Sequence, residues 1–236
     1  EFSFQGFIGS VASISLYGNM ITGSTDIGYS TAEYDLDLSG IIAFAEAAAI
    51  LKTLTSIDLS NCGIAAKGIA EVTKFISVNN SIARISVLSN PIGIDGATAL
   101  IDVYERNENL RTLLGIEEGV TELNLAKKQV DLGQAMVLAK ELQAGRAITS
   151  LTSLCCGSNP IKDEGMAVLL DAVKDVALIE FDIAKTEIGP PTAKKLAEVL
   201  SGATPFTSSI ASLSLKGNLP CGRISRDNDG RGPWLP

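Results

Sequence analysis

The clearest pattern of hydrophobic and polar positions runs from residue 54 to residue 92. It contains two similar segments, LTSIDLSNCGI and IARISVLSNPI, whose first residues, Leu54 and Ile82, lie 28 positions apart. Each segment has apolar residues at its first, fourth, sixth and eleventh positions and a Cys or Asn at its ninth. A period of this length indicates a repeat protein, in which no unit buries its apolar face alone and stability comes from stacked neighbours.

The fourth and sixth positions of each segment form a short pattern that is typical of a strand. Alternate side chains of a strand point to opposite faces, so we expect Ile57 and Leu59 in the core and Asp58 outside. The ninth position then turns the chain, where an Asn side chain can bond backbone groups that the turn leaves unpaired. A helix returns along the other side. The pattern predicts parallel strands at residues 57–59, 85–87, 123–125, 154–156, 181–183 and 213–215.

The full pattern, L-x-x-L-x-L-x-x-(N/C)-x-L, resembles that of leucine-rich repeat proteins. The 28-residue period with a helix in each unit resembles the ribonuclease-inhibitor type, which includes the repeat domains of NOD-like receptors and of Ran GTPase activators. The resemblance implies an α/β solenoid, a curved horseshoe with parallel strands on its concave side and helices on its convex side. It does not imply an activity, because function lies in sites placed on a fold.

Similar units recur along the chain at irregular spacing, beginning at Val11, Leu54, Ile82, Val120, Leu151, Leu178 and Ile210. The ninth-position residues, which we call slot residues, are expected to have a structural role at Asn19, Cys62, Asn90, Asn159 and Asn218. Lys128 and Thr186 occupy the same position in two other units. A unit that starts at Leu110 stops at Gly115, where we expect a truncated strand with a bulge.

Helices are predicted between the strands, at residues 39–51, 131–142, 163–174 and 191–200. Ser39 is expected to be the N-cap of the first of these helices, and Pro191 suits a first-turn position. The predicted organisation is a solenoid at residues 11–220 with an insertion at 24–38. It is flanked by an N-terminal cap or partner-bound segment at 1–10 and an irregular tail at 221–236.

The formal charge of −8 argues against a nucleic-acid partner, because binding to phosphates requires a basic surface. No apolar run reaches the roughly 18 residues of a membrane span. The four cysteines lack metal-ligand spacing and are expected to be reduced, which favours an intracellular location, with the cytoplasm preferred. An organellar location stays open because the chain has no initiator Met, as in a fragment or a processed form. The sequon at residues 79–81 would matter only in a secreted protein.

The available chemistry predicts that the chain is not an enzyme. The sequence contains no His, which removes the Ser-His-Asp, Cys-His and His-based zinc sites. It also has no GxxxxGK[ST] loop and no GxGxxG turn, so we expect no nucleotide cofactor and no metal. Cys155 and Cys156 are neighbours on opposite faces of a strand, which disfavours redox pairing. Acidic residues such as Asp95 and Asp163 lie where helices start and complement the helix dipole.

We therefore expect protein partners. The residues that point outward on the predicted strands are small or mildly acidic, whereas binding hot spots favour Trp, Tyr and Arg. The candidate partner contacts are accordingly Phe2, Phe4, Phe7, Tyr17, Arg223, Arg226, Arg231 and Trp234. The leading hypothesis is a non-enzymatic interaction or scaffold protein, including the case of a subunit of a larger assembly. The alternatives, both from the resemblance, are a GTPase-activating repeat protein and the ligand-sensing fragment of an NOD-like receptor.

Overall fold

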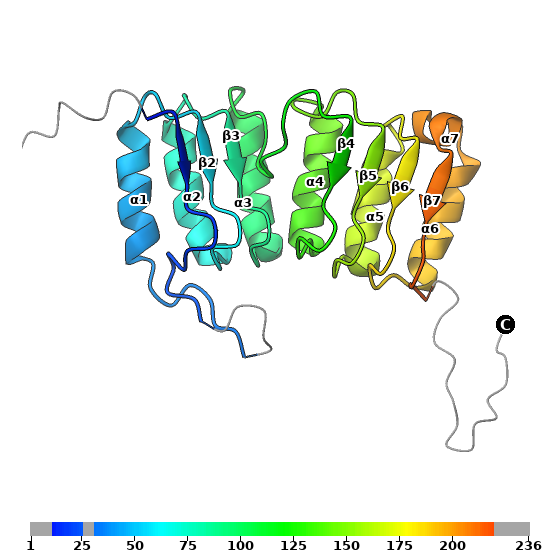
Figure 1. Ribbon diagram of the computed structural model, residues 1–236, viewed down its shortest axis with the longest axis horizontal. Helices are drawn as coiled ribbons and strands as arrows, with labels where there is room; N and C mark the ends of the chain where they lie inside the picture. The colour runs from blue at the N-terminus through cyan, green and yellow to red at the C-terminus, as the bar shows by residue number, and fades with distance from the viewer. Residues whose placement is uncertain (1–10, 26–30, 220–236) are drawn as a thin grey trace, which may run out of the picture.

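The computed structural model describes residues 11–25 and 31–219. These residues form two layers, one of short strands and one of helices, which follow the chain from one end of the molecule to the other (Figure 1). The strands are β1 Ser13–Ser15, β2 Ser56–Asp58, β3 Arg84–Ser86, β4 Glu122–Asn124, β5 Ser153–Cys155, β6 Glu180–Asp182 and β7 Ser212–Ser214. The helices are α1 Ser39–Ile50, α2 Ala66–Val78, α3 Gly93–Arg106, α4 Leu132–Ala144, α5 Lys162–Val173, α6 Pro190–Ser201 and α7 Pro205–Ser209.

The described strands form two parallel sheets, β1-β2-β3 and β4-β5-β6-β7. Their register aligns the central residue of each strand with that of its neighbour, as in the pairs of Ile14 with Ile57 and of Ile57 with Ile85. The architecture is therefore an α/β leucine-rich repeat solenoid, which confirms the predicted fold class. Each observed strand begins one residue before the predicted one, because the ladder is centred on the fourth position of the repeat and includes the residue before it.

The core lies between the strand layer and the helix layer and follows the alternation expected of a strand. Ile57 and Leu59 are buried, whereas Asp58 between them is half-buried. Each helix contributes its inner face, and two edge-to-face aromatic pairs join neighbouring units: Phe44 with Phe75 and Phe181 with Phe206. Stacking of neighbouring units therefore buries the apolar side chains that a single unit would leave exposed.

The slot residues hold adjacent units together at the turn after each strand. The buried Asn90 side chain accepts hydrogen bonds from the backbone N–H groups of Cys62 and Ile64, in the preceding unit. Its amide donates to the carbonyl oxygens of Leu59 and Val87 at 2.7 and 3.0 Å. One short side chain thus satisfies the turns of two units, which requires that the units lie at strand spacing, about 4.8 Å.

The other slots follow the same scheme where their side chains allow it. Asn159 accepts from Val130 N–H and donates to the carbonyls of Leu125 and Cys156. Asn218 accepts from Thr186 N–H in the preceding unit. Asn19, in the first described unit, bonds only the carbonyls of its own turn, and the buried Cys62 thiol donates to Leu16 O. The residue before each slot has a positive φ: Gly18, Asn61, Ser89, Lys127, Ser158, Lys185 and Gly217.

The described part of the insertion at 24–38 is tied to the unit that follows it. Ser24 is buried and donates to Gly63 O, and Thr25 pairs with Glu33 in an antiparallel bridge. The Asp35 carboxylate accepts from the N–H groups of Ala65 and Gly68. These groups belong to the first turn of α2 and the residue before it, so the insertion caps a helix of the next unit.

One detail of the helix predictions changes. Ser39 is the first residue of α1 and not its N-cap, because the preceding Leu38 already has a right-handed helical backbone. The carboxylate of Asp37 accepts from Ser39 N–H instead. At α6 the prediction is confirmed: the helix begins at Pro190, and Pro191 follows in the first turn, where a missing N–H has no cost.

Candidate interaction surface

The outward side chains of the seven described strands form one surface, which we call the strand face. It consists of Ser13, Ser15, Ser56, Asp58, Arg84, Ser86, Glu122, Asn124, Ser153, Cys155, Glu180, Asp182, Ser212 and Ser214. Every one of these residues is exposed or half-buried. Most are small, so the face is open and offers hydroxyl and carboxylate groups rather than large apolar side chains.

The two sheets differ in the charge of this face. On β1–β3 the charged residues are Asp58 and Arg84, one of each sign, and Asp58 accepts from Ser60 N–H and from the Ser15 hydroxyl. On β4–β7 the charged residues are Glu122, Glu180 and Asp182, all acidic. None of these three forms an ion pair with a residue in the described ranges. The second half of the strand face therefore carries unneutralised negative charge.

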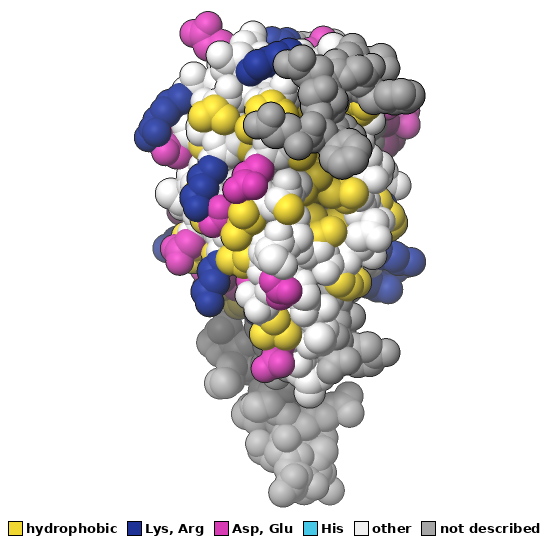
Figure 2. Space-filling model, turned by 90° about the vertical axis from the view of Figure 1, so that its left-hand side faces the viewer, with side chains coloured by type: hydrophobic (Ala, Val, Ile, Leu, Met, Phe, Trp, Pro, Cys, Tyr) yellow, Lys and Arg dark blue, Asp and Glu magenta, His cyan; other side chains and the backbone are white. Residues whose placement is uncertain are grey.

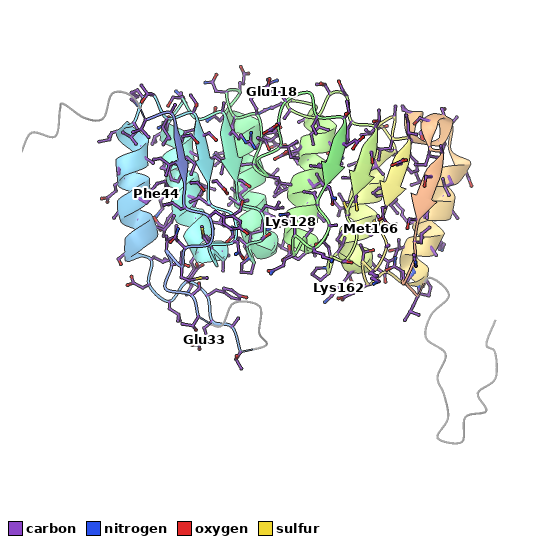
Figure 3. The ribbon with its side chains drawn as sticks, in the orientation of Figure 1. Glu33, Phe44, Glu118, Lys128, Lys162 and Met166 are labelled. Atoms are coloured by element: carbon purple, nitrogen blue, oxygen red, sulfur yellow. The ribbon has the colours of Figure 1, made fainter. Side chains whose placement is uncertain are left out.

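A shallow hollow of about 490 Å³ lies on the first half of the face. Its lining includes Ser56, Ser86 and, at opposite ends, Tyr17 and Lys128. Tyr17 is 60% exposed, and it is the candidate partner contact that the described residues include. Figure 3 labels Lys128 on the strand side, between the first and second sheets. The hollow thus has a mixed lining, with hydroxyl groups, the aromatic ring of Tyr17 and two cations, Arg84 and Lys128.

The adjacent cysteines lie on opposite sides of β5, as the alternation predicts. Cys156 is fully buried, and Cys155 is half-buried on the strand face, 3.5 Å from Asp182 Oδ2. Burial raises the pKa of both thiols, and the Asp182 carboxylate adds to the effect. A raised pKa keeps a thiol protonated and weakly nucleophilic. Cys62, Cys155 and Cys156 are free thiols.

The acidic residues at helix starts act on neighbouring units rather than as a site. The Asp163 carboxylate accepts from Gly189 N–H, from Thr192 N–H and from the Thr192 hydroxyl, and so caps α6 of the next unit. Burial opposes its charged form, but the bonds from Thr192 and Gly189 outweigh burial and lower the pKa of Asp163. Asp163 also lies in the first turn of its own helix α5, as expected, so it complements that helix and caps the next one. Asp95 lies in the first turn of α3, as expected.

Among residues 11–25 and 31–219, no group of three or more potential ligand side chains is placed to hold a metal ion. No helix in the same ranges is long and apolar enough to cross a membrane. Seven candidate contacts lie outside the described residues: Phe2, Phe4, Phe7, Arg223, Arg226, Arg231 and Trp234.

Sequence reasoning missed a second column of buried amides, at the ends of the helices. Asn79 follows α2 and donates to the carbonyls of Ala48 and Leu51, at the end of α1. Asn107 follows α3 and donates to Ile76 O in the same way. The two residues are 28 positions apart, which is the period of the repeat, so this spacing could have identified them from the sequence.

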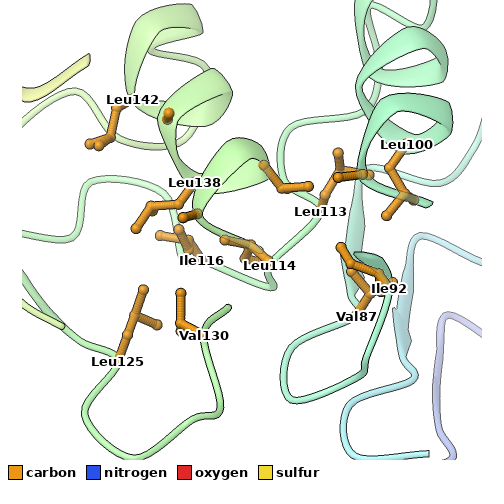
Figure 4. Close-up of a cluster of buried hydrophobic side chains, with 14 of the residues drawn as sticks. Val87, Ile92, Leu100, Leu113, Leu114, Ile116, Leu125, Val130, Leu138 and Leu142 are labelled. Atoms are coloured by element: carbon orange, nitrogen blue, oxygen red, sulfur yellow. The ribbon is translucent and has the colours of Figure 1, made fainter. Parts of the chain in front are cut away.

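The truncated unit at 110–119, which the sequence predicted from Leu110, lies at the junction between β3 and β4, where the regular stack is interrupted; sequence reasoning missed the side chains that it bonds. Its backbone bonds that of β3 around the bridges of Arg84 with Thr112 and of Ser86 with Leu114, for example from Ile85 N–H to Thr112 O and from Gly115 N–H to Ile85 O. Leu113 lies on the side of Leu100 of α3, while Leu114 and Ile116 lie beside Leu138 of α4 (Figure 4). Leu113, Leu114 and Ile116 are all buried, so the truncated unit contributes to the core on both sides of the junction.

Long polar side chains from the α4 unit complete this junction. Gln134 donates to the carbonyls of Val87 and Asn90 and accepts from Ser89 N–H. Arg146 donates to the carbonyls of Tyr104, Asn107 and Leu110, and its guanidinium lies 4.2 Å from the centre of the Tyr104 ring.

Glu141 is the buried carboxyl of the junction. It is 1% exposed and accepts from the N–H groups of Leu113 and Leu114 and from the Thr112 hydroxyl. Burial raises the pKa of Glu141 to about 7, although these three hydrogen bonds act in the opposite direction. Its neighbourhood also raises the pKa of Tyr104 to about 12, mainly through burial.

No protein-family model matches this sequence, and no curated protein matches it. Among solved structures, the C-terminal domain of tropomodulin from Caenorhabditis elegans is similar, with 12% sequence identity and a TM-score of 0.32. The alignment covers 82% of this chain and 84% of the tropomodulin domain. The fold assignment rests on the parallel strands and stacked helices described above.

Proposed function

We propose that this chain is a non-enzymatic protein-interaction scaffold. The observation that carries the proposal is the strand face, an open row of side chains on parallel strands that the slot asparagines and the core hold in register. A surface that is ordered before binding loses little conformational entropy on association. Repeat solenoids provide extended surfaces of this kind.

The partner that this surface fits is a protein segment with basic side chains. Glu122, Glu180 and Asp182 project from one sheet without an ion-pair partner among the described residues, and the whole chain has a charge of −8. Opposite charges across an interface speed association and exclude partners of the wrong sign. The same negative charge disfavours nucleic acid.

Large side chains of the terminal segments are the proposed anchors. A buried Trp or Phe covers about 150–250 Å² and dominates interface energetics, whereas the serines of the strand face cover little. The tail at 221–236 follows the exposed Leu219 and supplies Trp234 as the apolar anchor, while Arg223, Arg226 and Arg231 have the charge that suits the acidic body of this same chain rather than a basic partner. We propose that this tail and Tyr17 hold the partner against the strand face.

We also propose an intracellular location and a ribonuclease-inhibitor type of repeat. Free thiols at Cys62, Cys155 and Cys156 support the first, because disulfides are rare in reducing compartments. The sequon at 79–81 supports it too, since Asn79 is fully buried and bonded to α1. The 28-residue step from Ser56 to its register partner Arg84, with α2 between them, supports the repeat type.

Affinity capture from the native source tests the proposal. The baits are the parent chain, the variant Glu122→Gln/Glu180→Gln/Asp182→Asn, and a chain without residues 221–236. The control bait, Glu46→Gln/Glu108→Gln/Glu198→Gln, loses the same charge at exposed positions away from the strand face.

We expect a saturable partner that the parent and the control retain and that the strand-face variant binds at least tenfold more weakly. Equal retention by the strand-face variant would refute the assigned surface. Full retention without the tail would remove the tail as an anchor. Stimulation of GTP hydrolysis by the parent chain would refute the non-enzymatic assignment.

A further inference from the structure

The hollow on the first half of the strand face differs in chemistry from the acidic second half. Its volume is about 490 Å³, and the strand register places Ser13, Ser56 and Arg84 in one row across β1, β2 and β3. Beyond the other end of these strands, Tyr17 and Lys128 complete the lining, one at each side. Since Tyr17 lies four residues after Ser13, the hollow extends about 13 Å along the strands.

Several hydrogen-bond donors in this lining have no partner within the described residues. The Lys128 ammonium group forms no ion pair there, and the hydroxyl groups of Ser56 and Tyr17 form no hydrogen bond there. The Arg84 guanidinium bonds only the Glu117 carboxylate. Ammonium and guanidinium groups donate and cannot accept. The hollow therefore fits a ligand that is rich in acceptors.

The acceptor in the middle row of the hollow, the Asp58 carboxylate, is already bonded within the chain. Its Oδ1 accepts from Ser60 N–H at 2.9 Å, and its Oδ2 accepts from the Ser15 hydroxyl at 3.3 Å. The hydroxyl groups of Ser60 and Ser86 bond each other at 2.7 Å. The acceptor side of the lining is thus satisfied internally, whereas its donor side is not.

The one contact that the Arg84 guanidinium makes is loose. Its nitrogen lies 3.5 Å from the Glu117 carboxylate, and both side chains are exposed, at 42% and 79%. Exposed ion pairs of this kind contribute little to stability. A carboxylate that enters the hollow therefore competes with Glu117 for Arg84 at small cost.

The first unit offers no further cations to such a ligand. The sequence has no Lys or Arg before Lys52, while acidic residues such as Asp37 and Glu46 lie in this stretch. Figure 2 looks at the end of the molecule that the first unit forms. It shows hydrophobic and acidic side chains across the middle of this end, with Lys and Arg side chains mainly toward its edges. An acidic ligand in the hollow therefore extends toward β4 rather than past β1.

The acidic second half of the strand face lies within reach of the same ligand. From Arg84 on β3 to Glu180 on β6 there are at least four strand steps: the truncated unit, β4, β5 and β6. At strand spacing this is about 19 Å, which about six residues of an extended chain span. One short segment can therefore contact both halves.

We propose that the hollow binds acidic side chains of the same partner segment whose basic side chains bind Glu180 and Asp182. Carboxylates of the segment pair with Arg84 and Lys128 and accept from the free hydroxyl groups of the lining. The inference rests on the proposed function and adds to the basic segment an acidic one about six residues away. Opposite charges at the two halves select one direction of binding, because the reversed segment would place like charges together.

Two synthetic peptides and the full chain test this proposal. The probe has three Glu, six Gly and Ser residues and three Lys, in that order, and the reference has three Gln in place of the Glu. We expect the parent to bind the probe with a Kd at least threefold lower than that of the reference. In Arg84→Gln/Lys128→Gln the two peptides should bind equally. The control, Lys67→Gln/Lys194→Gln, removes exposed lysines of α2 and α6 and should keep the threefold difference.

The variant Glu117→Gln separates a ligand site from a merely structural ion pair. It frees Arg84, so it should bind the probe at least twofold more tightly than the parent and leave the reference unchanged. Unchanged or weaker probe binding would refute the assignment of Arg84 to a ligand.

The remaining outcomes are distinct from one another. Equal binding of the two peptides to the parent, or binding of neither, would overturn the proposal, as would a threefold difference that persists in Arg84→Gln/Lys128→Gln. Stronger competition with the probe by inorganic phosphate than by acetate, at equal charge, would assign the hollow to a phosphorylated partner instead. The proposed function fails separately, if the reference binds Glu122→Gln/Glu180→Gln/Asp182→Asn as tightly as the parent.

Discussion

The step from β2 to β3 and the step from β3 to β4 join their units by different means. In the first, 28 residues separate Leu54 from Ile82, the strands pair in register, and Asn90 bonds both turns. In the second, 38 residues separate Ile82 from Val120, no described strand pairs with β3 on that side, and Lys128 occupies the slot. A short amide spans only the distance between paired strands, so the wider step depends on longer side chains.

At the wide step, longer side chains bond the backbone groups that asparagines bond at the regular steps. Gln134 bonds Val87 O, the carbonyl that a slot asparagine of the next unit would bond. Arg146 bonds the carbonyls at the end of α3, as Asn79 and Asn107 do for α1 and α2. Glu141 takes the N–H groups of the truncated unit that no strand pairs. The same backbone groups are satisfied, but two of the three replacements are ionisable.

Glu141 gives the largest expected difference between the two steps, and it depends on pH. Its pKa is about 7 in the folded chain against 4.5 for the free side chain, so the folded state binds the proton more tightly. Stability from this group is complete below pH 4.5, falls as the pH rises to 7 and stays low above it. The loss is on the order of 3 kcal/mol.

Urea unfolding of the parent and of Glu141→Gln, from pH 4.5 to 8, measures this effect. Glutamine keeps an acceptor for Leu113 and Leu114, but it does not titrate. The variant should therefore gain on the parent as the pH rises. Glu198→Gln, at an exposed position of α6, is the control and should run parallel to the parent. Parallel curves for Glu141→Gln as well would contradict the assigned role.

At the regular steps, Asn90→Ala and Asn159→Ala should each lower the free energy of unfolding by about 2 kcal/mol, within a range of about 1–3. Each substitution leaves buried N–H and C=O groups of two units without a partner. Asn80→Ala removes an exposed amide and serves as the control. If both buried variants unfold at the same urea concentration as Asn80→Ala, the slots do not stabilise the stack.

Arg146→Ala should cost about 1–2 kcal/mol, less than a slot asparagine, because Arg146 is only half-buried and water can replace part of its bonding. Arg146→Lys should restore only part of the loss: one terminal nitrogen of Arg146 bonds all three carbonyls, which an ammonium group can imitate, but the planar stacking on Tyr104 is lost. Arg106→Ala, which breaks an exposed ion pair with Asp102, should have almost no effect. Full recovery in the Lys variant would show that charge alone is sufficient.

The regular steps could be predicted from the sequence and the wide step could not. Ile57, Leu59 and Cys62 repeat as Ile85, Val87 and Asn90, so period and pattern determine where the strands, turns and core lie. At the wide step the truncated unit was visible from Leu110 to Gly115, but its bonding partners were not. They depend on how far apart two units stand, which a pattern along one chain does not measure.

One local signal was present in α4. Gln134, Leu138 and Glu141 are spaced as one face of a helix, so two polar residues stand on a stripe that is otherwise apolar. Polar residues on such a stripe are expected to find buried partners. The strand face shows the opposite case: its residues were predicted correctly as outward, but small polar side chains on a strand do not identify a ligand.

Lys128 is the slot residue that departs from the repeat at the wide step. Lys128→Asn restores the repeat consensus at the wide step, yet we expect the free energy of unfolding to change by less than about 0.5 kcal/mol, as for an ordinary surface substitution. An asparagine at this position would find Val87 O, Asn90 O and Ser89 N–H already bonded to Gln134. Gln134→Ala should instead cost about 1–2 kcal/mol, because it leaves those groups buried without a partner.

The double variant Lys128→Asn/Gln134→Ala tests whether the distance between the units prevents an asparagine from bonding them. If the gap is too wide for an asparagine, Lys128→Asn will not rescue Gln134→Ala, and the two effects will add. A rescue of 1 kcal/mol or more would mean that the units at this step stand as close as β2 and β3.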